Sequence, residues 1–345
     1  MNTKVVTFGE LLLRLASPLH QRFSQAQVFE KSFGGSEANV AISLARLGIA
    51  SEFVTQLPRN DFGQSALMLL KMHDVENDHI IIGGNRMGLY FVEKGSMNRP
   101  SRVIYDRQYS SFSEIQPGSI NWDQVLEQGS WFHWSGITPA VSQSAANVCK
   151  DALMVAAKKG ITISCDLNYR DALWNYGVNT TTMMAEMVKE CDVIISNEED
   201  SEKFFNIKPE KNNVIDGEID YKSYEQVGRK LCERFPKVKI VAFSLRSSRS
   251  ADDNSWSGVI WDGKSLIKSK EYQMTNIVDR IGGGDSFAAG LIYGLINHPA
   301  DRQRTIDFAV AASSLKHTIH GDFNLSTLGE VLAVMDGNFA GRIQR

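Results

Sequence analysis

Apolar runs and amphipathic segments alternate along most of the chain. Runs typical of buried strands are found at 4–9, 51–57, 131–136, 161–166, 192–197 and 239–244. Segments with apolar residues at helical spacing lie between and after them, at 37–48, 144–160, 223–235 and 285–294. This alternation predicts an α/β fold with a mainly parallel sheet that helices cover on both faces. Ligands bind such sheets at the carboxyl ends of the strands.

Two segments, 11–33 and 86–108, depart from this rhythm because they alternate like strands without helices between them. We expect them to pair as a small antiparallel sheet, either as surface hairpins or as a lid over the strand ends. The chain is then divided into a main α/β domain, formed by 1–10, 34–85 and 109–345, and an inserted β lid.

Composition limits the class of protein. The 345 residues are 43% apolar and 22% charged, which is ordinary for a globular protein with a large core. A net charge of −3 argues against nucleic acid as a partner. The N-terminus lacks the apolar stretch of a signal peptide, and no apolar run is long enough to span a membrane, so we expect a cytoplasmic protein without a membrane partner. The four cysteines form no C-x-x-C pair, which argues against zinc and disulfides.

Three glycines, Gly282, Gly283 and Gly284, lead directly into Asp285 and an apolar helix. Glycines before a helix N-terminus favour a close approach of an anion to backbone N–H groups. A carboxylate would repel that anion unless it had another role, such as taking a proton from a nucleophile. The alternative is a flexible turn in which Asp285 only caps the helix.

A second glycine motif, "FGGSEANVAISLARLG", places Gly34 and Gly35 before a helix with Glu37 and Asn39 in its first turn. The Asn39 amide offers a donor and an acceptor to a polyol or phosphate. The alternative is a plain turn and helix cap.

The stretch "GVIWDGKS" (258–265) matches the P-loop pattern letter for letter. Its apolar middle is typical of a strand, and Asp262-Gly263 is typical of a hairpin turn. We therefore expect a β-hairpin there.

The two motifs "GGSEANVAISLARLG" and "DRIGGGDSFAAG", in this order and at this separation, resemble the signatures of the PfkB (ribokinase-like) sugar kinases. The resemblance covers essentially the whole chain. It implies a ribokinase-like three-layer α/β/α sandwich with a β lid, and ATP and Mg²⁺ as cofactors. It also implies that Asp285 is the catalytic base and that the N–H groups of Gly282, Gly283 and Gly284 form the anion hole for the transferred phosphate, roles that suit phosphoryl transfer.

Several positions depart from the family pattern. Arg280 stands where a small residue or proline is usual, which leaves open whether K⁺ is a further cofactor. Glycine replaces alanine at position 283, which we expect to loosen the anion hole. The family's N-x-x-E motif appears as "NEED" (197–200). It implies an ATP contact at Asn197 and a water-mediated Mg²⁺ contact at Asp200 or Glu199, with Glu198 as a further candidate. The alternative is a solvated acidic helix start.

The glycine pair that the family carries after the 239–244 strand is missing and is replaced by "LRSSRSADDNSW" (245–256). We expect a remodelled nucleotide loop in which Ser244 and Arg246 contact ATP, together with Gly282 and Gly284.

Further stretches, "GLYF", "YDR", "SGITPA" and "DLNYRDALW", are similar to the 2-keto-3-deoxygluconate kinases within this family. Two arginines, Arg107 and Arg170, would suit the carboxylate of a sugar acid. Alternatively, Tyr90 and Tyr105 pack the lid, and Arg170 pairs with Asp166 or another carboxylate. Neither His133 nor His317 has metal-ligand spacing. The substrate contacts that the resemblance implies are Gly34, Gly35, Asn39, Tyr90, Tyr105, Arg107, Asn168, Arg170 and Asp322.

The sequence therefore predicts ATP-dependent phosphorylation of 2-keto-3-deoxygluconate to 2-keto-3-deoxy-6-phosphogluconate. The alternatives are a fructokinase or another sugar kinase of the family, and a sugar or nucleotide sensor that has lost turnover. Because the lid strands carry exposed apolar residues, we expect a homodimer through the lid.

Overall fold

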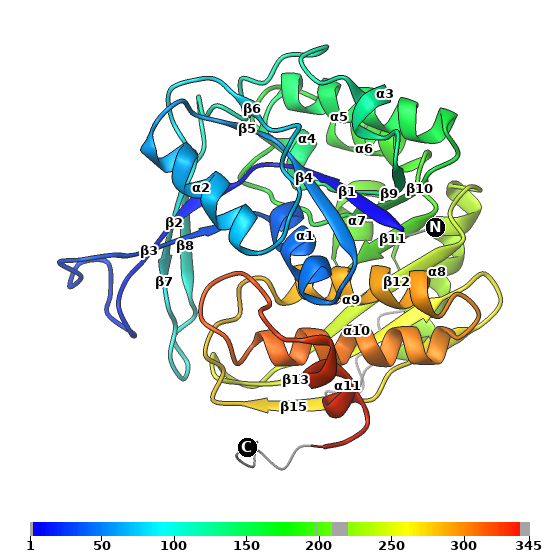
Figure 1. Cartoon of the computed structure of the whole chain (residues 1–345). Coiled ribbons are helices and arrows are strands. Elements are labelled where there is room, and N and C mark those ends of the chain that lie inside the picture. The colour runs from blue at the N-terminus through cyan, green and yellow to red at the C-terminus, as the bar shows by residue number, and fades with distance from the viewer. Residues whose placement is uncertain (1–2, 198, 209–219, 339–345) are drawn as a thin grey trace.

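The central element of the fold is a twisted sheet at the middle of the molecule (Figure 1). The computed structural model describes residues 3–197, 199–208 and 220–338. Within these ranges the sheet has the order β14-β13-β12-β11-β10-β9-β1-β4, and β15 pairs with β13. Its strands are β1 (Lys4–Phe8), β4 (Ala50–Val54), β9 (Gly129–Ser135), β10 (Thr162–Asp166), β11 (Val193–Ser196), β12 (Ile240–Ser248), β13 (Asp253–Trp261), β14 (Leu266–Lys268) and β15 (Tyr272–Thr275).

Helices cover both faces of this sheet. Because side chains alternate along a strand, Val6 and Ile194 belong to one apolar core and Val5 and Ile195 to the other. Figure 1 shows α5 and α6 on one side and α9 and α10 on the other. The helices are α1 (Ser36–Arg46), α2 (Asp61–Met72), α3 (Trp122–Val125), α4 (Ile137–Val141), α5 (Gln143–Lys158), α6 (Thr180–Val188), α7 (Asp200–Phe205), α8 (Tyr221–Arg234), α9 (Gly283–Asn297), α10 (Arg302–Lys316) and α11 (Leu328–Met335).

The predicted α/β/α sandwich is confirmed, and its sheet is parallel from β4 through β12. At one edge the pairing turns antiparallel, because β12, β13 and β14 are joined by hairpins. No helix in the described part of the chain is long and apolar enough to cross a membrane.

A separate four-stranded sheet has the order β3-β2-β7-β8 and stands at one side of the main body (Figure 1). We call it the lid. The prediction of an antiparallel sheet was wrong at its centre, where β2 and β7 are parallel. The lid consists of two antiparallel hairpins, β2 with β3 and β7 with β8. The hairpins are joined through their inner strands, β2 and β7, which run in the same direction. The strands are β2 (Leu12–Ala16), β3 (Glu30–Gly34), β7 (Leu89–Glu93) and β8 (Arg102–Asp106), and a further pair is formed by β5 (Gln56–Leu57) and β6 (Ile81–Ile82).

The P-loop look-alike is a hairpin, as predicted. Gly258 to Trp261 belong to β13, and β14 returns antiparallel to it. At the turn, Gly263 has a φ of +85°, and the Asp262 carboxylate accepts hydrogen bonds from the backbone N–H groups of Lys264 and Ser265. The expected loop at 245–256 is different: β12 continues to Ser248 and pairs with β13 from Asp253, so most of it is regular sheet.

Candidate active site

A cavity of about 760 Å³ lies between the lid and the main sheet, at the carboxyl ends of the parallel strands. The fold brings together at this cavity the two glycine motifs, Asn197 and Asp200 of the "NEED" stretch, and the lid strands, although these segments are far apart in the sequence. The residues expected at the site all line it: Gly34, Gly35, Asn39, Tyr90, Tyr105, Arg107, Asn168, Arg170, Asn197, Glu199, Asp200, Ser244, Arg246, Gly282, Gly283, Gly284, Asp285 and Asp322.

Asp285 lies in the first turn of α9, facing the first turn of α1. Its carboxylate accepts a hydrogen bond from the Ser36 hydroxyl at 2.6 Å and one from the Asn39 amide at 2.7 Å. The other end of that amide accepts from the backbone N–H of Gly35 at 3.3 Å. Burial raises the pKa of Asp285, and the two hydrogen bonds oppose the rise. In this structure Asn39 therefore orients the carboxylate, and Ser36, which sequence reasoning missed, does the same.

The glycine run before α9 is tightly packed on one side. Gly282 has a φ of +83°, and a Cβ there would lie 1.9 Å from the carbonyl oxygen of Asp322. A Cβ at Gly283 would lie 2.7 Å from Cε1 of His317. The expectation that glycine at 283 loosens the anion hole was therefore wrong, because the His317 ring fills that space. Gly284 has open space around it, on the cavity side.

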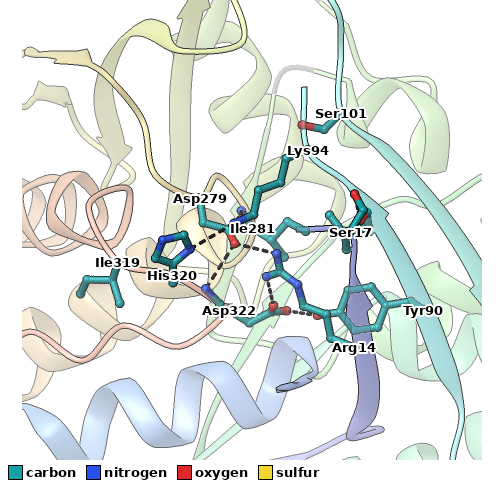
Figure 2. Close-up of polar contacts among 12 residues, drawn as sticks. Arg14, Ser17, Tyr90, Lys94, Ser101, Asp279, Ile281, Ile319, His320 and Asp322 are labelled. Carbon is teal, nitrogen blue, oxygen red and sulfur yellow. Dashed lines mark hydrogen bonds and ion pairs between the residues drawn. The ribbon is translucent and has the colours of Figure 1, made fainter. Parts of the chain in front are cut away.

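A buried ion-pair network joins the lid to this loop (Figure 2). Arg14 on β2 is 1% exposed. Its guanidinium donates to Asp322 at 2.7 Å and to Asp279 at 2.6 Å. The Tyr90 hydroxyl donates to the second oxygen of Asp322 at 2.6 Å. Burial raises the pKa of Asp322, and the Arg14 charge opposes the rise. Sequence reasoning missed Arg14, although an arginine inside the apolar run "LLLRL" was a signal, since such a residue needs a buried partner.

Arg107 also has a carboxylate partner in this structure. Its Nη2 lies 2.7 Å from Oε2 of Glu10, and both side chains are buried. The Tyr105 ring stacks on the Tyr90 ring with centroids 5.9 Å apart, and the Arg107 guanidinium lies over Tyr105. The lid wall of the cavity is therefore a packed aromatic pair beside a neutralised arginine.

The opposite wall carries two buried carboxylates, Asp166 and Asp200. Burial, followed by the charges of Asp200 and Asp285, raises the pKa of Asp166 well above its ordinary value, and Arg170 opposes the rise. Arg170 is exposed to the cavity, and its guanidinium donates to the backbone carbonyl of Tyr169 at 3.4 Å. It therefore presents a cation to the space in front of Asp285.

Helix α7 begins at Asp200, the last residue of the "NEED" stretch. The Asn197 side chain accepts hydrogen bonds from the backbone N–H groups of Glu199 and Asp200, at 2.8 and 3.0 Å. The Asp200 carboxylate accepts from the backbone N–H of Tyr169 at 3.0 Å and from that of Asn197 at 3.3 Å. Among the described residues no group of three or more His, Cys, Asp or Glu side chains could hold a metal ion. Glu198 lies outside the described residues.

The far end of the cavity is cationic. The Arg246 guanidinium lies over the Trp256 ring, 5.0 Å from its centroid, and Arg280 donates to Asn254 at 2.9 Å. Burial lowers the pKa of Arg246 to about 10, and the charges of Arg280 and Arg170 add to this effect. A wall on which guanidinium groups repel one another is suited to a polyphosphate. A second cavity of about 230 Å³, lined by Tyr272, Asn276, Leu315 and His317 among others, lies beside the end of α10.

With this geometry established, comparison with known proteins identifies the family. The profile of the pfkB family carbohydrate kinases matches residues 2–327. The chain belongs to the pfkB family. It is 41% identical to the solved 2-dehydro-3-deoxygluconokinase of Thermotoga maritima, with a TM-score of 0.90 over 97% of this chain and 100% of that one.

Two curated relatives of the pfkB family extend over most of the chain. A 2-dehydro-3-deoxygalactonokinase of Haloferax volcanii is 29% identical over 99% of both chains. A 2-dehydro-3-deoxygluconokinase of Thermoproteus tenax is 25% identical over 92% of this chain and 89% of the relative. The protein is thus a carbohydrate kinase with a ribokinase-like fold, and membership of the pfkB family implies the use of ATP and a divalent metal.

Proposed function

We propose that this kinase phosphorylates 2-keto-3-deoxygluconate with ATP and releases 2-keto-3-deoxy-6-phosphogluconate and ADP. The observation that carries the proposal is Asp285, fixed by Ser36 and Asn39 at the N-terminus of α9, in a cavity where the Arg170 guanidinium is exposed. The substrate class is supported by the relatives that bear the names of sugar-acid kinases.

In this mechanism Asp285 accepts the proton of the sugar's 6-hydroxyl as the oxygen attacks the γ-phosphorus of ATP. The bond between the γ-phosphorus and the bridging oxygen breaks, and ADP leaves with that oxygen. Backbone N–H groups at Gly283 and Gly284, at the positive end of α9, would stabilise the charge on the transferred phosphoryl group. Gly282, whose φ is positive, precedes α9 directly and sets the direction in which the chain enters the helix.

The nucleotide would lie along the cationic end of the cavity, where Asn197, Ser244 and Arg246 line the wall. Mg²⁺ would neutralise the ATP phosphates, with Asp200 and Glu199 as water-mediated partners. The adenine is proposed for the smaller cavity beside α10.

The sugar would lie between the lid and Asp285, against Gly34, Gly35, Asn168 and the Tyr90–Tyr105 pair. Because Glu10 neutralises Arg107, we assign the substrate carboxylate to Arg170. Arg107 would act indirectly, by fixing the lid side of the cavity through its contacts with Glu10 and Tyr105. A buried carboxylate needs a cationic partner, since an unpaired buried charge is very unfavourable.

The test is the rate of ADP formation with 2-keto-3-deoxygluconate, fructose and ribose. Arg170→Ala should lower kcat/KM on the sugar acid by ~30-fold to several thousand-fold, because a charge-assisted bond to a buried group is worth about 2–5 kcal/mol. The loss on fructose should be much smaller, because fructose has no carboxylate. Arg107→Ala should reduce kcat/KM on both sugars by similar factors.

Equal losses on both sugars in Arg170→Ala would remove Arg170 from carboxylate recognition. A wild-type preference for fructose would replace the proposal with a fructokinase. Absence of sugar-dependent ADP formation would favour a sensor.

A further inference from the structure

The end of α10 carries a fully buried lysine. Lys316 is 0% exposed. Its ammonium donates to two main-chain carbonyl oxygens, that of Ile319 at 3.1 Å and that of Asp279 at 3.4 Å. A buried ammonium is costly, so a chain that retains one at this depth gains something from the charge.

The charged groups around Lys316 come from four elements. Asp279, Asp322 and Asp285 favour its charged form, whereas Arg14 opposes it. Burial is the largest effect and lowers the pKa of Lys316 to about 8. Together with Arg14, Lys316 therefore supplies positive charge that offsets the negative charge of Asp279, Asp285 and Asp322.

The two carbonyl groups belong to two loops that meet here, and Figure 2 labels Asp279 in one loop and Ile319 in the other. The Asp279 carboxylate accepts from the backbone N–H of Ile281 and from that of Gly321, each at 3.2 Å. A Cβ at Gly282 would collide with the Asp322 carbonyl, so the loops touch without space between them. The first of these loops runs directly into the anion-hole turn.

Carbonyl oxygens from two loops, with carboxylates behind them, form the kind of environment in which proteins hold a dehydrated monovalent cation. The family resemblance left K⁺ open as a cofactor of this kinase. The residues present do not fit K⁺, because the covalently attached Lys316 ammonium already donates to both carbonyl oxygens.

We infer that the Lys316 ammonium is a built-in replacement for a monovalent cation, which holds the 279–282 and 317–322 loops together and makes the kinase independent of K⁺. Lys316 lines neither of the two cavities, so in the proposed arrangement it contacts neither sugar nor nucleotide. It is a positioning residue that acts through Asp279 and the turn that follows it. The inference rests on carbohydrate kinase activity and not on the identity of the sugar.

The experiment compares wild type, Lys316→Ala and Lys316→Met in choline, Na⁺ and K⁺ buffers. Wild type should show the same kcat and the same unfolding temperature in all three. Lys316→Ala leaves a space lined by carbonyl oxygens, and its kcat should fall by ~10²-fold in choline, because a small displacement of catalytic groups costs about that much. Adding K⁺ or NH₄⁺ should raise the kcat of Lys316→Ala at least tenfold over its value in choline, and should also raise its unfolding temperature.

Two controls separate this role from simple packing. Lys316→Met fills the space without a charge, so K⁺ should change neither its kcat nor its unfolding temperature. Lys94 contacts the His320 side chain of the 317–322 loop at 3.0 Å, so it is a lysine control that touches the same loop without the two carbonyl contacts of Lys316 (Figure 2). Lys94→Ala should keep wild-type activity in all three buffers.

The pH profile gives a further readout. Because Lys316 loses its proton above its lowered pKa of about 8, wild-type kcat should fall as pH rises through that value. Lys316→Ala saturated with K⁺ should lack this alkaline limb.

Activation or stabilisation of wild type by K⁺ would overturn the inference. A folded Lys316→Ala that K⁺ neither activates nor stabilises would overturn it as well. If Lys316→Ala does not fold, the comparison of wild type in choline and K⁺ decides by itself. These stability readouts need no substrate, so they stay informative even if the proposed sugar is wrong.

Discussion

Two short hydrogen bonds fix the carboxylate of Asp285, the proposed general base: one from Ser36 at 2.6 Å and one from Asn39 at 2.7 Å. Both favour the ionised carboxylate, whereas burial favours the protonated one. The net effect raises the pKa of Asp285 above its ordinary value of 3.8. A general base with a raised pKa loses activity at higher pH than an exposed aspartate would.

We predict that Ser36→Ala raises the pKa of Asp285 further, because one hydrogen bond to the ionised form is lost. The acid limb of the kcat–pH profile should therefore move to higher pH, while kcat on its plateau changes little. Asp285→Asn serves as the control and should lower kcat by ~10²–10⁴-fold at every pH. An acid limb that stays in place in Ser36→Ala would mean that Asp285 does not titrate as the base.

Single residues were predictable from the sequence where they belong to a motif, and they were missed where they stand outside any motif. Asp285 and the glycines were predicted because a helix start, a carboxylate and missing Cβ atoms together indicate chemistry, and they line the cavity. Arg14, Glu10 and Lys316 belong to no motif, and each has a partner that is distant in sequence. Their burial was predictable in principle, but the partners were not, because pairing depends on the tertiary fold.

The elements that hold the site together are the lid strands and the two loops beside α9 and α10. Strand β2 delivers Arg14 to Asp279 and Asp322, and β7 delivers Tyr90 to Asp322. Element types were predictable from periodicity. The parallel pairing of β2 with β7 was not, since each hairpin satisfies the alternation pattern by itself. The extension of β12 through the polar stretch 245–248 was missed because its serines and arginine are typical of a loop.

We predict that Arg14→Met destabilises the protein by about 3–5 kcal/mol, because two buried carboxylates lose their partner. Arg14→Met combined with Asp322→Asn should recover part of this loss, since one of the orphaned charges is removed. Urea unfolding of the wild type and the variants measures both effects. An unchanged midpoint in Arg14→Met would show that the lid does not depend on this network.

At the scale of the whole molecule, the edge of the lid bears on how copies of the chain associate. Strand β8 forms an edge of the lid sheet. Val103 and Tyr105 line the cavity, whereas Ile104, on the opposite face of the strand, is 52% exposed. An exposed apolar edge strand is a site of association unless a partner covers it. This is why we propose a homodimer through the lid.

We predict that wild type sediments at twice the chain mass and that Ile104→Lys sediments as a monomer. Met154 on α5 is 61% exposed and lies on the main body, so Met154→Lys is a matched control that should remain dimeric. A monomeric wild type at micromolar concentration would exclude the lid interface, and a dimeric Ile104→Lys would move the interface elsewhere.

The Arg14–Asp322 pair joins residues 308 positions apart in the chain. During synthesis, β2 leaves the ribosome among the first strands, whereas the partner carboxylate emerges near the end. Because N-terminal segments begin to fold first, a nascent chain shorter than 322 residues must keep the Arg14 guanidinium hydrated or bury it with only Asp279 as its partner. Docking of the lid is therefore a late event in the synthesis and folding of this enzyme. A chain that stalls before Asp322 would display an undocked lid, a feature by which quality control could recognise it.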